Sequence, residues 1–253
     1  MARLVVLGSG TSTGVPMLGC GCAVCRSADP RDRRLRPSVL FEGGETRVVV
    51  DTTPEFRIQG LRAGLDHLNA VFLTHPHADH VAGLDDVRAF TMRTRRPVSV
   101  YADADTLEAV RTRFAYIFGP PYVGGNLPLL DLCELAGPVT VGPLTFQPLE
   151  VFHGPMPVTA FRVGGLAYVT DVNRIPDAAR AELRGLDTLI MSGACVRPHP
   201  THFTLDEALA EIEDLRPRRA YLTHLGHQVS HARTSRGLPP GVALAYDGLS
   251  IEF

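Results

Sequence analysis

The stretch Thr74-His75-Pro76-His77-Ala78-Asp79-His80 follows a short apolar run that begins at Ala70. We expect residues 70–74 to form a strand, which places the histidines where that strand ends. Two imidazoles spaced two residues apart can close on one metal ion, and the Asp-His pair behind them can close on a second. Neutral imidazole is the usual protein ligand for Zn²⁺ and similar ions. The stretch therefore predicts a two-metal site.

Three further ligand-type residues follow later apolar runs. His153, Asp171 and His224 each come directly after a run that predicts a strand. The ends of strands are where sheet-built sites collect their residues, so these side chains can complete the metal site. A paired-metal site activates water and stabilises charge on an attacked phosphoryl or acyl group. We therefore expect a metal-dependent hydrolase.

A second metal site is indicated by the segment Cys20-Gly21-Cys22-Ala23-Val24-Cys25. The chain has five cysteines, and an odd count with this spacing fits metal binding in a reducing compartment better than disulfides. A closed zinc site needs a fourth ligand, and His227 is a spare histidine close to His224. We predict that Cys20, Cys22, Cys25 and His227 bind a structural zinc. It would pin the apolar-poor loop 11–34 beside the active site.

The composition narrows the class of protein. The chain has 253 residues and a net charge of −2, from 25 basic and 27 acidic side chains. This balance argues against a dedicated nucleic-acid binder, and the absence of Lys excludes Lys-based catalysis. No signal peptide and no apolar stretch of roughly 20 residues is visible. We expect a soluble cytoplasmic protein without a membrane partner. The arginine-rich stretch 26–36 is expected to be a solvated loop, with phosphate or RNA binding as the alternatives.

The order of predicted elements favours an α/β fold. Strands and then mixed strands and helices occur twice along the chain, which predicts two sheets packed face to face with helices outside. The segments 242–245 and 249–252 predict a terminal hairpin through Asp247-Gly248. Residues 105–118 predict one amphipathic helix. The loop 119–125, rich in Gly and Pro, is either a lid over the site or plain surface.

These motifs resemble the metallo-β-lactamase fold superfamily over nearly the whole chain. The resemblance implies an αββα sandwich and a single hydrolase domain over residues 1–253. It implies two Zn²⁺ or Mn²⁺ ions in the active site. Asp51 matches an acidic residue that supports the site from behind; capping of the helix that follows is the alternative. The implied ligands are His75, His77 and His153 for one ion, Asp79, His80 and His224 for the other, and Asp171 as a bridge.

Within that superfamily, the chain is similar to the phosphoribosyl 1,2-cyclic phosphate phosphodiesterases of the PhnP type. Gly19–Arg26 and Leu222–His227 match the cysteine and Leu-Thr-His-x-x-His elements that a structural zinc joins in that family. The resemblance also implies a histidine that acts as general acid; His202 is our choice and His199 its rival. A similar cysteine cluster occurs in the metallo-β-lactamase-fold protein of pyrroloquinoline quinone synthesis, so the cluster alone does not identify the substrate.

The expected reaction is hydrolysis of a small, cyclic phosphodiester by a hydroxide that two metals activate. Asp79 would help to hold the hydroxide, and His202 would protonate the leaving alkoxide. The expected partner is the small phosphodiester substrate, and no nucleic-acid partner is expected. The sequence leaves open whether the protein forms a homodimer. One alternative is an endoribonuclease that processes tRNA 3′ ends. Another is an accessory protein of cofactor synthesis on the same fold.

Overall fold

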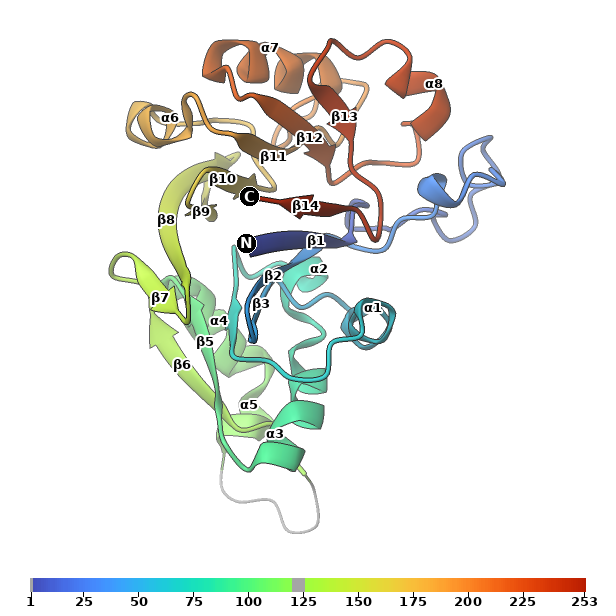
Figure 1. Cartoon of the computed structure of the whole chain (residues 1–253). Coiled ribbons are helices and arrows are strands. Elements are labelled where there is room, and N and C mark those ends of the chain that lie inside the picture. The colour runs from blue at the N-terminus through green and yellow to red at the C-terminus, as the bar shows by residue number, and fades with distance from the viewer. Residues whose placement is uncertain (1, 120–125) are drawn as a thin grey trace.

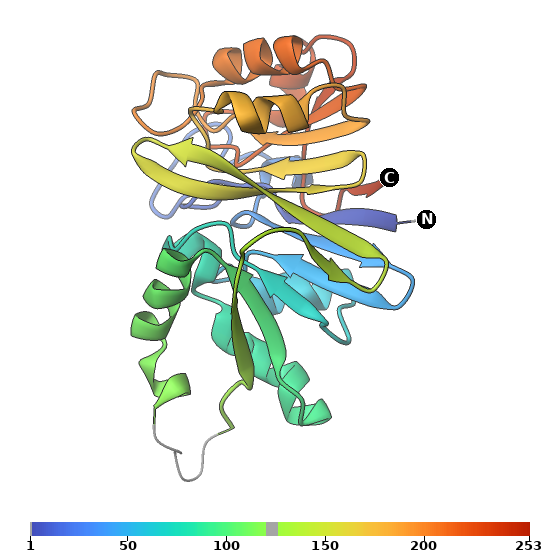
Figure 2. The ribbon, with the colours of Figure 1, turned by 90° about the vertical axis from the view of Figure 1, so that its left-hand side faces the viewer.

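A computed structural model describes residues 2–119 and 126–253. Within these residues, two seven-stranded sheets face each other, with the strand orders β14-β1-β2-β3-β4-β5-β6 and β13-β12-β11-β10-β9-β8-β7. Figure 2 shows the two sheets as stacked layers with helices on their outer sides. The αββα architecture predicted from the sequence is confirmed. The first part of the candidate lid ends at residue 119, and its residues 120–125 lie outside the described part of the chain.

The elements of the first half begin with the strands β1 (Ala2–Gly8), β2 (Ser38–Gly43) and β3 (Thr46–Val50) and the 3-10 turn Pro30–Asp32. They continue with α1 (Phe56–Ala63), β4 (Ala70–Phe72), α2 (Ala78–Val81), the 3-10 turn Leu84–Val87, α3 (Arg88–Thr94) and β5 (Val98–Ala102). The half ends with α4 (Ala104–Arg113), α5 (Ala115–Phe118) and β6 (Leu130–Glu134).

The second half contains β7 (Val139–Val141), β8 (Leu144–His153), β9 (Met156–Val163), β10 (Leu166–Val169), α6 (Asp177–Leu183) and β11 (Thr188–Ser192). It ends with α7 (Leu205–Leu215), β12 (Arg219–Thr223), α8 (His231–Ser235), β13 (Val242–Leu244) and β14 (Ser250–Glu252). None of the described helices has the length and apolarity needed to cross a bilayer.

Three apolar layers hold this arrangement together. The layer between the sheets contains Phe41, Phe72, Phe146 and Phe161, and the rings of Phe72 and Phe146 stack with centroids 4.3 Å apart. A second layer lies between the second sheet and the helices α6 and α7. A third lies between the first sheet and α1, α3 and α4. Burial of these apolar side chains is the main favourable term in folding.

The strand directions gather the polar residues. β3 and β4 are parallel neighbours in the first sheet, and β10, β11 and β12 are parallel neighbours in the second. The carboxyl ends of parallel strands meet at one edge of a sheet. A hydrogen bond from the backbone N–H of Thr159 to the carbonyl of Thr74 (2.9 Å) joins the two sheets near that edge. The candidate residues therefore collect at one rim of the sandwich.

The predicted terminal hairpin is wrong. β13 pairs with β12 in the second sheet, whereas β14 pairs with β1 in the first, and Figure 1 shows β14 beside β1. The chain crosses between the sheets because the half-buried Asp247 carboxylate accepts hydrogen bonds from the backbone N–H groups of Ser9 (2.9 Å) and Leu35 (2.8 Å). The predicted helix 105–118 is also divided, since α4 ends at Arg113 and α5 begins at Ala115.

Candidate metal centre

Elements of both sheets deliver the candidate ligands. His75 and His77 lie between β4 and α2, and α2 itself carries Asp79 and His80. His153 is the last residue of β8, while Asp171 and His224 follow β10 and β12. At this rim, potential ligand atoms of the described residues that lie within 4.8 Å of one another form three groups. These are Asp79, His80, Asp171 and His224; His75, His77 and Asp171; and His153, Asp171 and His202.

Asp171 is the residue that these groups share. Its Oδ1 lies 3.5 Å from His80 Nε2 and 3.1 Å from His224 Nε2. Its other oxygen, Oδ2, lies 3.9 Å from His75 Nε2. The two oxygens of one carboxylate therefore face two different histidine groups. This is the arrangement that a ligand shared by two metal ions requires.

Hydrogen bonds fix the orientation of two of the histidine rings. His80 Nδ1 lies 2.7 Å from Asp51 Oδ2, and His153 Nδ1 lies 2.7 Å from the carbonyl of Thr201. In each ring, Nδ1–H donates to the oxygen, so in the neutral form of the ring Nε2 carries no proton and can bind a metal. Asp51 is fully buried, and its carboxylate also accepts a hydrogen bond from the backbone N–H of Thr74 (2.8 Å). The helix cap that was its alternative role belongs to Glu55.

The unpaired nitrogen atoms of the site fit a metal centre. Within residues 2–119 and 126–253, His80 Nε2 and both ring nitrogens of His224 are buried and meet no hydrogen-bond partner. Buried polar atoms without partners cost free energy, so proteins rarely leave several side by side. A set of imidazole and carboxylate donors is the chemistry that Zn²⁺ and Mn²⁺ accept. The residues present therefore fit the metal ions that the fold implies.

Backbone geometry marks the same rim. Asp51, Asp171 and His224 have positive φ angles of 67°, 47° and 58°. The left-handed region is unfavourable for side chains other than glycine, and such residues cluster at functional sites. Each of the three follows a strand, so the turn aims the side chain across the strand ends. The three residues give up some stability to reach the site.

The surroundings favour a neutral His75 and an ionised Asp171. Burial lowers the pKa of His75 well below its ordinary value, which favours the neutral imidazole that binds metal. For Asp171, burial opposes ionisation, but the neighbouring His224 and His80 outweigh it and hold the pKa well below its usual range.

His202 lies closer to this cluster than His199 does. The His202 ring centroid is 4.4 Å from that of His153 and 5.0 Å from that of His224. His199 is exposed and contacts the ring of His202 at 5.1 Å. Burial, followed by the nearby His224, lowers the pKa of His202 to about 3. His202 therefore lies beside the candidate metal ligands His153 and His224, and His199 lies farther out.

The cysteine cluster forms as a separate group. One ligand atom each from Cys20, Cys22, Cys25 and His227 lies within 4.8 Å of the others. His227 Nδ1 is 3.2 Å from Cys20 Sγ and 3.5 Å from Cys22 Sγ. The backbone N–H of Cys25 contributes most to lowering the pKa of Cys22 to about 6, whereas burial raises the pKa of Cys25 to about 11. Three sulfurs and one nitrogen are a common structural-zinc set.

Some residues of the site carry no clear sequence signal. The hydroxyl of Thr74 contacts Asp51 Oδ2 (2.9 Å), and the backbone carbonyl of Thr201 holds His153. The Thr of the Thr-His motif could have suggested the first contact, but a backbone carbonyl leaves no trace in the sequence. The sequence predicts a solvated loop around Arg34, but the structure buries this side chain.

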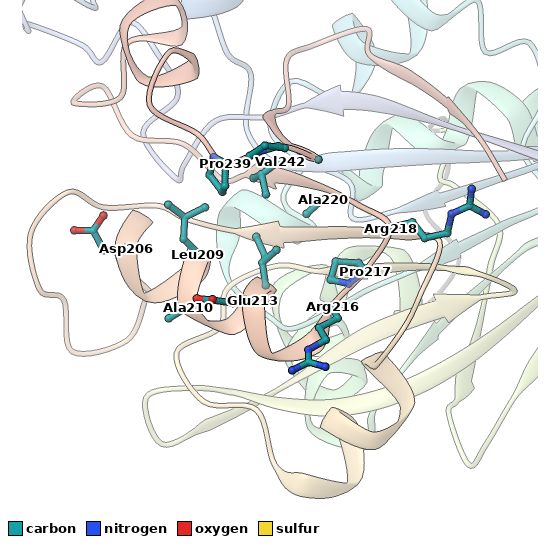
Figure 3. A pocket seen from close by; sticks show the side chains of 13 residues that line it. Asp206, Leu209, Ala210, Glu213, Arg216, Pro217, Arg218, Ala220, Pro239 and Val242 are labelled. Atoms are coloured by element: carbon teal, nitrogen blue, oxygen red, sulfur yellow. The ribbon is translucent and has the colours of Figure 1, made fainter.

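The groove in Figure 3 is separate from this site. It measures about 590 Å³ and lies between α7 and the loop that leads into β13. Leu209, Pro217, Pro239 and Val242 line it together with charged groups. It opens beside Arg218, just before β12, whereas His224 follows the other end of that strand.

Comparisons with known proteins agree with the fold. The profile of the family described as "Beta-lactamase superfamily domain" matches residues 46–225. A crystal structure described as a new diphosphatase from the PhnP family is 42% identical, has a TM-score of 0.94, and covers 100% of this chain and 97% of its own. The Zn²⁺-bound PqqB of Methylobacterium extorquens has a TM-score of 0.78 at 22% identity and covers 99% of this chain and 100% of its own. The latter similarity shows the fold alone.

Curated relatives carry different names. A protein of Porphyromonas gingivalis named octanoyltransferase is 41% identical over 254 residues, covering 98% of this chain. The chain spans only about half of that protein (51%). Coenzyme PQQ synthesis protein B of Methylobacterium nodulans is 30% identical, over 76% of this chain and 72% of its own length. The family match and the 42%-identical PhnP-family structure together show that the chain belongs to the metallo-β-lactamase superfamily, in its PhnP-type branch.

Proposed function

We propose that this chain is a metal-dependent phosphodiesterase that hydrolyses a small, cyclic phosphodiester. The observation that carries the proposal is the position of Asp171, whose two oxygens face His75 on one side and His80 and His224 on the other. We propose His75, His77 and His153 as ligands of one ion. Asp79, His80 and His224 would hold the second ion, and Asp171 would bind both. Residues 1–253 would act as one hydrolase domain.

The proposed roles follow from the donor set. Two Zn²⁺ or Mn²⁺ ions, when bound, supply an activated water and neutralise negative charge on the phosphoryl oxygens. Asp51 and the Thr201 carbonyl keep His80 and His153 in the tautomer that binds metal. Asp79 accepts a hydrogen bond from the attacking water and orients it. The negative charge of the bound phosphodiester would favour the protonated ring of His202, which would then donate its proton to the leaving oxygen of the ester.

We also propose that Cys20, Cys22, Cys25 and His227 bind one structural zinc. Support comes from the convergence of these four side chains and from the buried position of Cys25. The site would tie the N-terminal loop to the segment that carries His224.

A second candidate is hydrolysis of a diphosphate bond. It is favoured by the 42%-identical relative whose structure is described as a diphosphatase. Both reactions attack phosphorus and differ in the leaving group. A phosphate leaves without help more readily than an alkoxide, so only the diester reaction depends strongly on protonation by His202.

The deciding experiment is a substrate screen with Zn²⁺ and with Mn²⁺. Cyclic ribose phosphates, cyclic nucleotides, linear phosphodiesters, diphosphates, octanoyl thioesters and precursor tRNA are compared, and the released alcohol, phosphate or fragment is measured. We expect ring opening of a cyclic diester to be fastest. Faster phosphate release from diphosphates would favour the second candidate. Cleavage of precursor tRNA at low salt would favour an endoribonuclease, and thioester turnover or an inert, metal-replete protein would contradict phosphoester hydrolysis altogether.

A further inference from the structure

The side chain of Arg34 is the largest of the fully buried side chains in the described residues and is 1% exposed. Its Nη2 donates to the carbonyl of Val229 (2.9 Å) and to Asp32 Oδ1 (3.1 Å). Its Nη1 donates to the carbonyl of Gly226 (3.3 Å), and its Nε to that of Arg31 (3.1 Å). A buried guanidinium is costly unless it is paired, and this one is paired on all three nitrogens. The acceptors around this position match the donors of a guanidinium group.

The same contacts hold both ends of one segment. Gly226 and Val229 belong to the loop that follows β12, and the Asp32 carboxylate also accepts the backbone N–H of His231 (2.7 Å). Hydrogen bonds to Arg34 and Asp32 therefore hold the segment 226–231 at both of its ends. His227 lies inside it, and His224 lies two residues before it. Figure 1 shows the blue N-terminal loop beside the red segment that leads into α8.

The backbone next to His224 is held from the same side. Leu225 N–H donates to the carbonyl of Ser9 (2.8 Å), and Gly10 forms a bridge with Leu225. A Cβ on Gly10 would lie 2.9 Å from the Cβ of Arg34, so Arg34 packs directly against the residue that pairs with Leu225. Arg34 is therefore linked through Gly10 to Leu225, the residue that follows His224.

His224 depends on its backbone more than the other histidines do. His80 is oriented by Asp51 and His153 by Thr201, but His224 Nδ1 meets no partner among residues 2–119 and 126–253. Its φ of 58° is also unfavourable and must be held by the surrounding structure. Besides the neighbouring rings of His80 and His202, the hydrogen bonds of the following loop hold the backbone of His224 in place.

We propose that Arg34 is a positioning residue that sets His224 and His227 together and so couples the cysteine site to the metal centre. This inference rests on the proposed function for the identity of the ligands. The alternatives for the arginine stretch, a solvated loop or a surface that binds phosphate or RNA, do not fit the burial of Arg34. Lysine has neither the planar fork nor the reach of donors to meet these acceptors.

The test compares Arg34→Lys with Arg33→Lys, the same change at the exposed neighbour. Zn²⁺ affinity is measured by chelator competition, and access to the cysteines by the rate of labelling with a thiol reagent. Outer partners of metal ligands typically contribute about 10–100-fold in affinity, so we expect Arg34→Lys to weaken binding at least tenfold. Labelling should accelerate, and excess Zn²⁺ should restore part of the turnover. Arg33→Lys should match the wild type in every measurement.

A folded Arg34→Lys protein with a lower melting temperature but wild-type zinc affinity and labelling would overturn the inference, since that result describes a purely structural role. If Arg34→Lys does not fold, Asp32→Asn replaces it, because it removes the charge that pairs with Arg34 and keeps the side-chain shape. Unchanged zinc affinity in Asp32→Asn would likewise overturn it. Metal affinity needs no substrate, so a wild-type protein inert on all phosphoesters contradicts the proposed function and leaves this result readable.

Discussion

Asp51 Oδ2 lies 2.7 Å from His80 Nδ1, and neither side chain is exposed to solvent. Asp51 directly follows β3, whereas His80 lies in α2, and the backbone N–H of Thr74 donates to the other oxygen of the Asp51 carboxylate. His80 therefore meets the centre with its Nε2 free. The pair explains why a buried carboxylate outside the ligand set belongs to the site.

The first prediction concerns this pair. Asp51→Asn keeps the size of the side chain but removes its charge and offers an amide N–H toward His80. The ring loses its fixed tautomer, and we expect the affinity of the active site for Zn²⁺ to fall by about 10–100-fold. Chelator competition measures the affinity, with Asp187→Asn, on an exposed carboxylate, as control. Equal affinity in Asp51→Asn and wild type would mean that Asp51 does not orient His80.

The loss of activity in a His202 variant should depend on the leaving group of the substrate. In His202→Asn, we expect kcat on a cyclic diester with an alkoxide leaving group to fall by about 10²–10⁴-fold. The loss on bis-p-nitrophenyl phosphate should be much smaller, because p-nitrophenolate leaves without a proton. His199→Asn serves as the matched control and should retain activity on both substrates. Equal losses on both substrates in His202→Asn would exclude the role of general acid.

The zinc content of the purified protein should reveal the cysteine site. Changing Cys20, Cys22 and Cys25 together to Ser should remove about one zinc per chain, because a closed structural site needs its thiolate ligands. Elemental analysis of the purified protein gives the count, and Cys133→Ser, outside the cluster, should leave it unchanged. Structural zinc binding is coupled to folding, so the triple variant should also melt earlier. An unchanged zinc count would remove the site from the account.

A pH effect on stability follows from His67. Its Nε2 faces the carbonyl of Glu45 (2.6 Å) and its Nδ1 faces Asp66 (2.7 Å), so both nitrogens donate and the ring is charged. The Glu45 carbonyl, followed by Asp66, raises the pKa of His67 above its ordinary value of 6.5. The stabilisation of the folded protein by the charged His67 ring is fully present below pH 6.5. It is lost as the pH rises through the pKa of His67 in the folded state.

The variant His67→Gln should therefore lose stability mainly at acidic pH. Exposed pairs contribute at most about 1 kcal/mol, so the expected difference in the free energy of unfolding is small. Urea denaturation at pH 5.5 and pH 8.5 measures it, and the two proteins should converge at the higher pH. A difference that grows with pH would show that the ring is neutral when folded.

Much of the fold could be predicted from the sequence, because local signals such as apolar spacing and helix caps agree with the final structure. The sequence predicts a helix over residues 205–215, and the structure confirms these bounds in α7, which begins with a Thr204–Glu207 capping box. The terminal hairpin failed because Asp-Gly signals a turn but not which strands the turn connects. Here Asp247 binds Ser9 and Leu35, more than 200 residues away in sequence.

The sequence could predict those parts of the candidate site in which side chains supply the metal ligands. Strand-end His and Asp residues identified the groups that converge, and the Cys spacing identified the second cluster. Backbone donors and acceptors, such as the Thr201 carbonyl behind His153, have no residue signature. Arg34 was misread because charge in a sequence predicts exposure, whereas its burial depends on acceptors that only the fold brings to it.

The most direct test of the account is the metal content and turnover of Asp171→Ala. Both oxygens of Asp171 face histidine groups, so its loss should remove active-site metal and turnover together, while the zinc of the cysteine site remains. Elemental analysis and hydrolysis of bis-p-nitrophenyl phosphate are measured on the same preparation. We predict a lower metal-to-protein ratio and a loss of nearly all hydrolysis. Retention of wild-type hydrolysis in Asp171→Ala would contradict the two-metal centre.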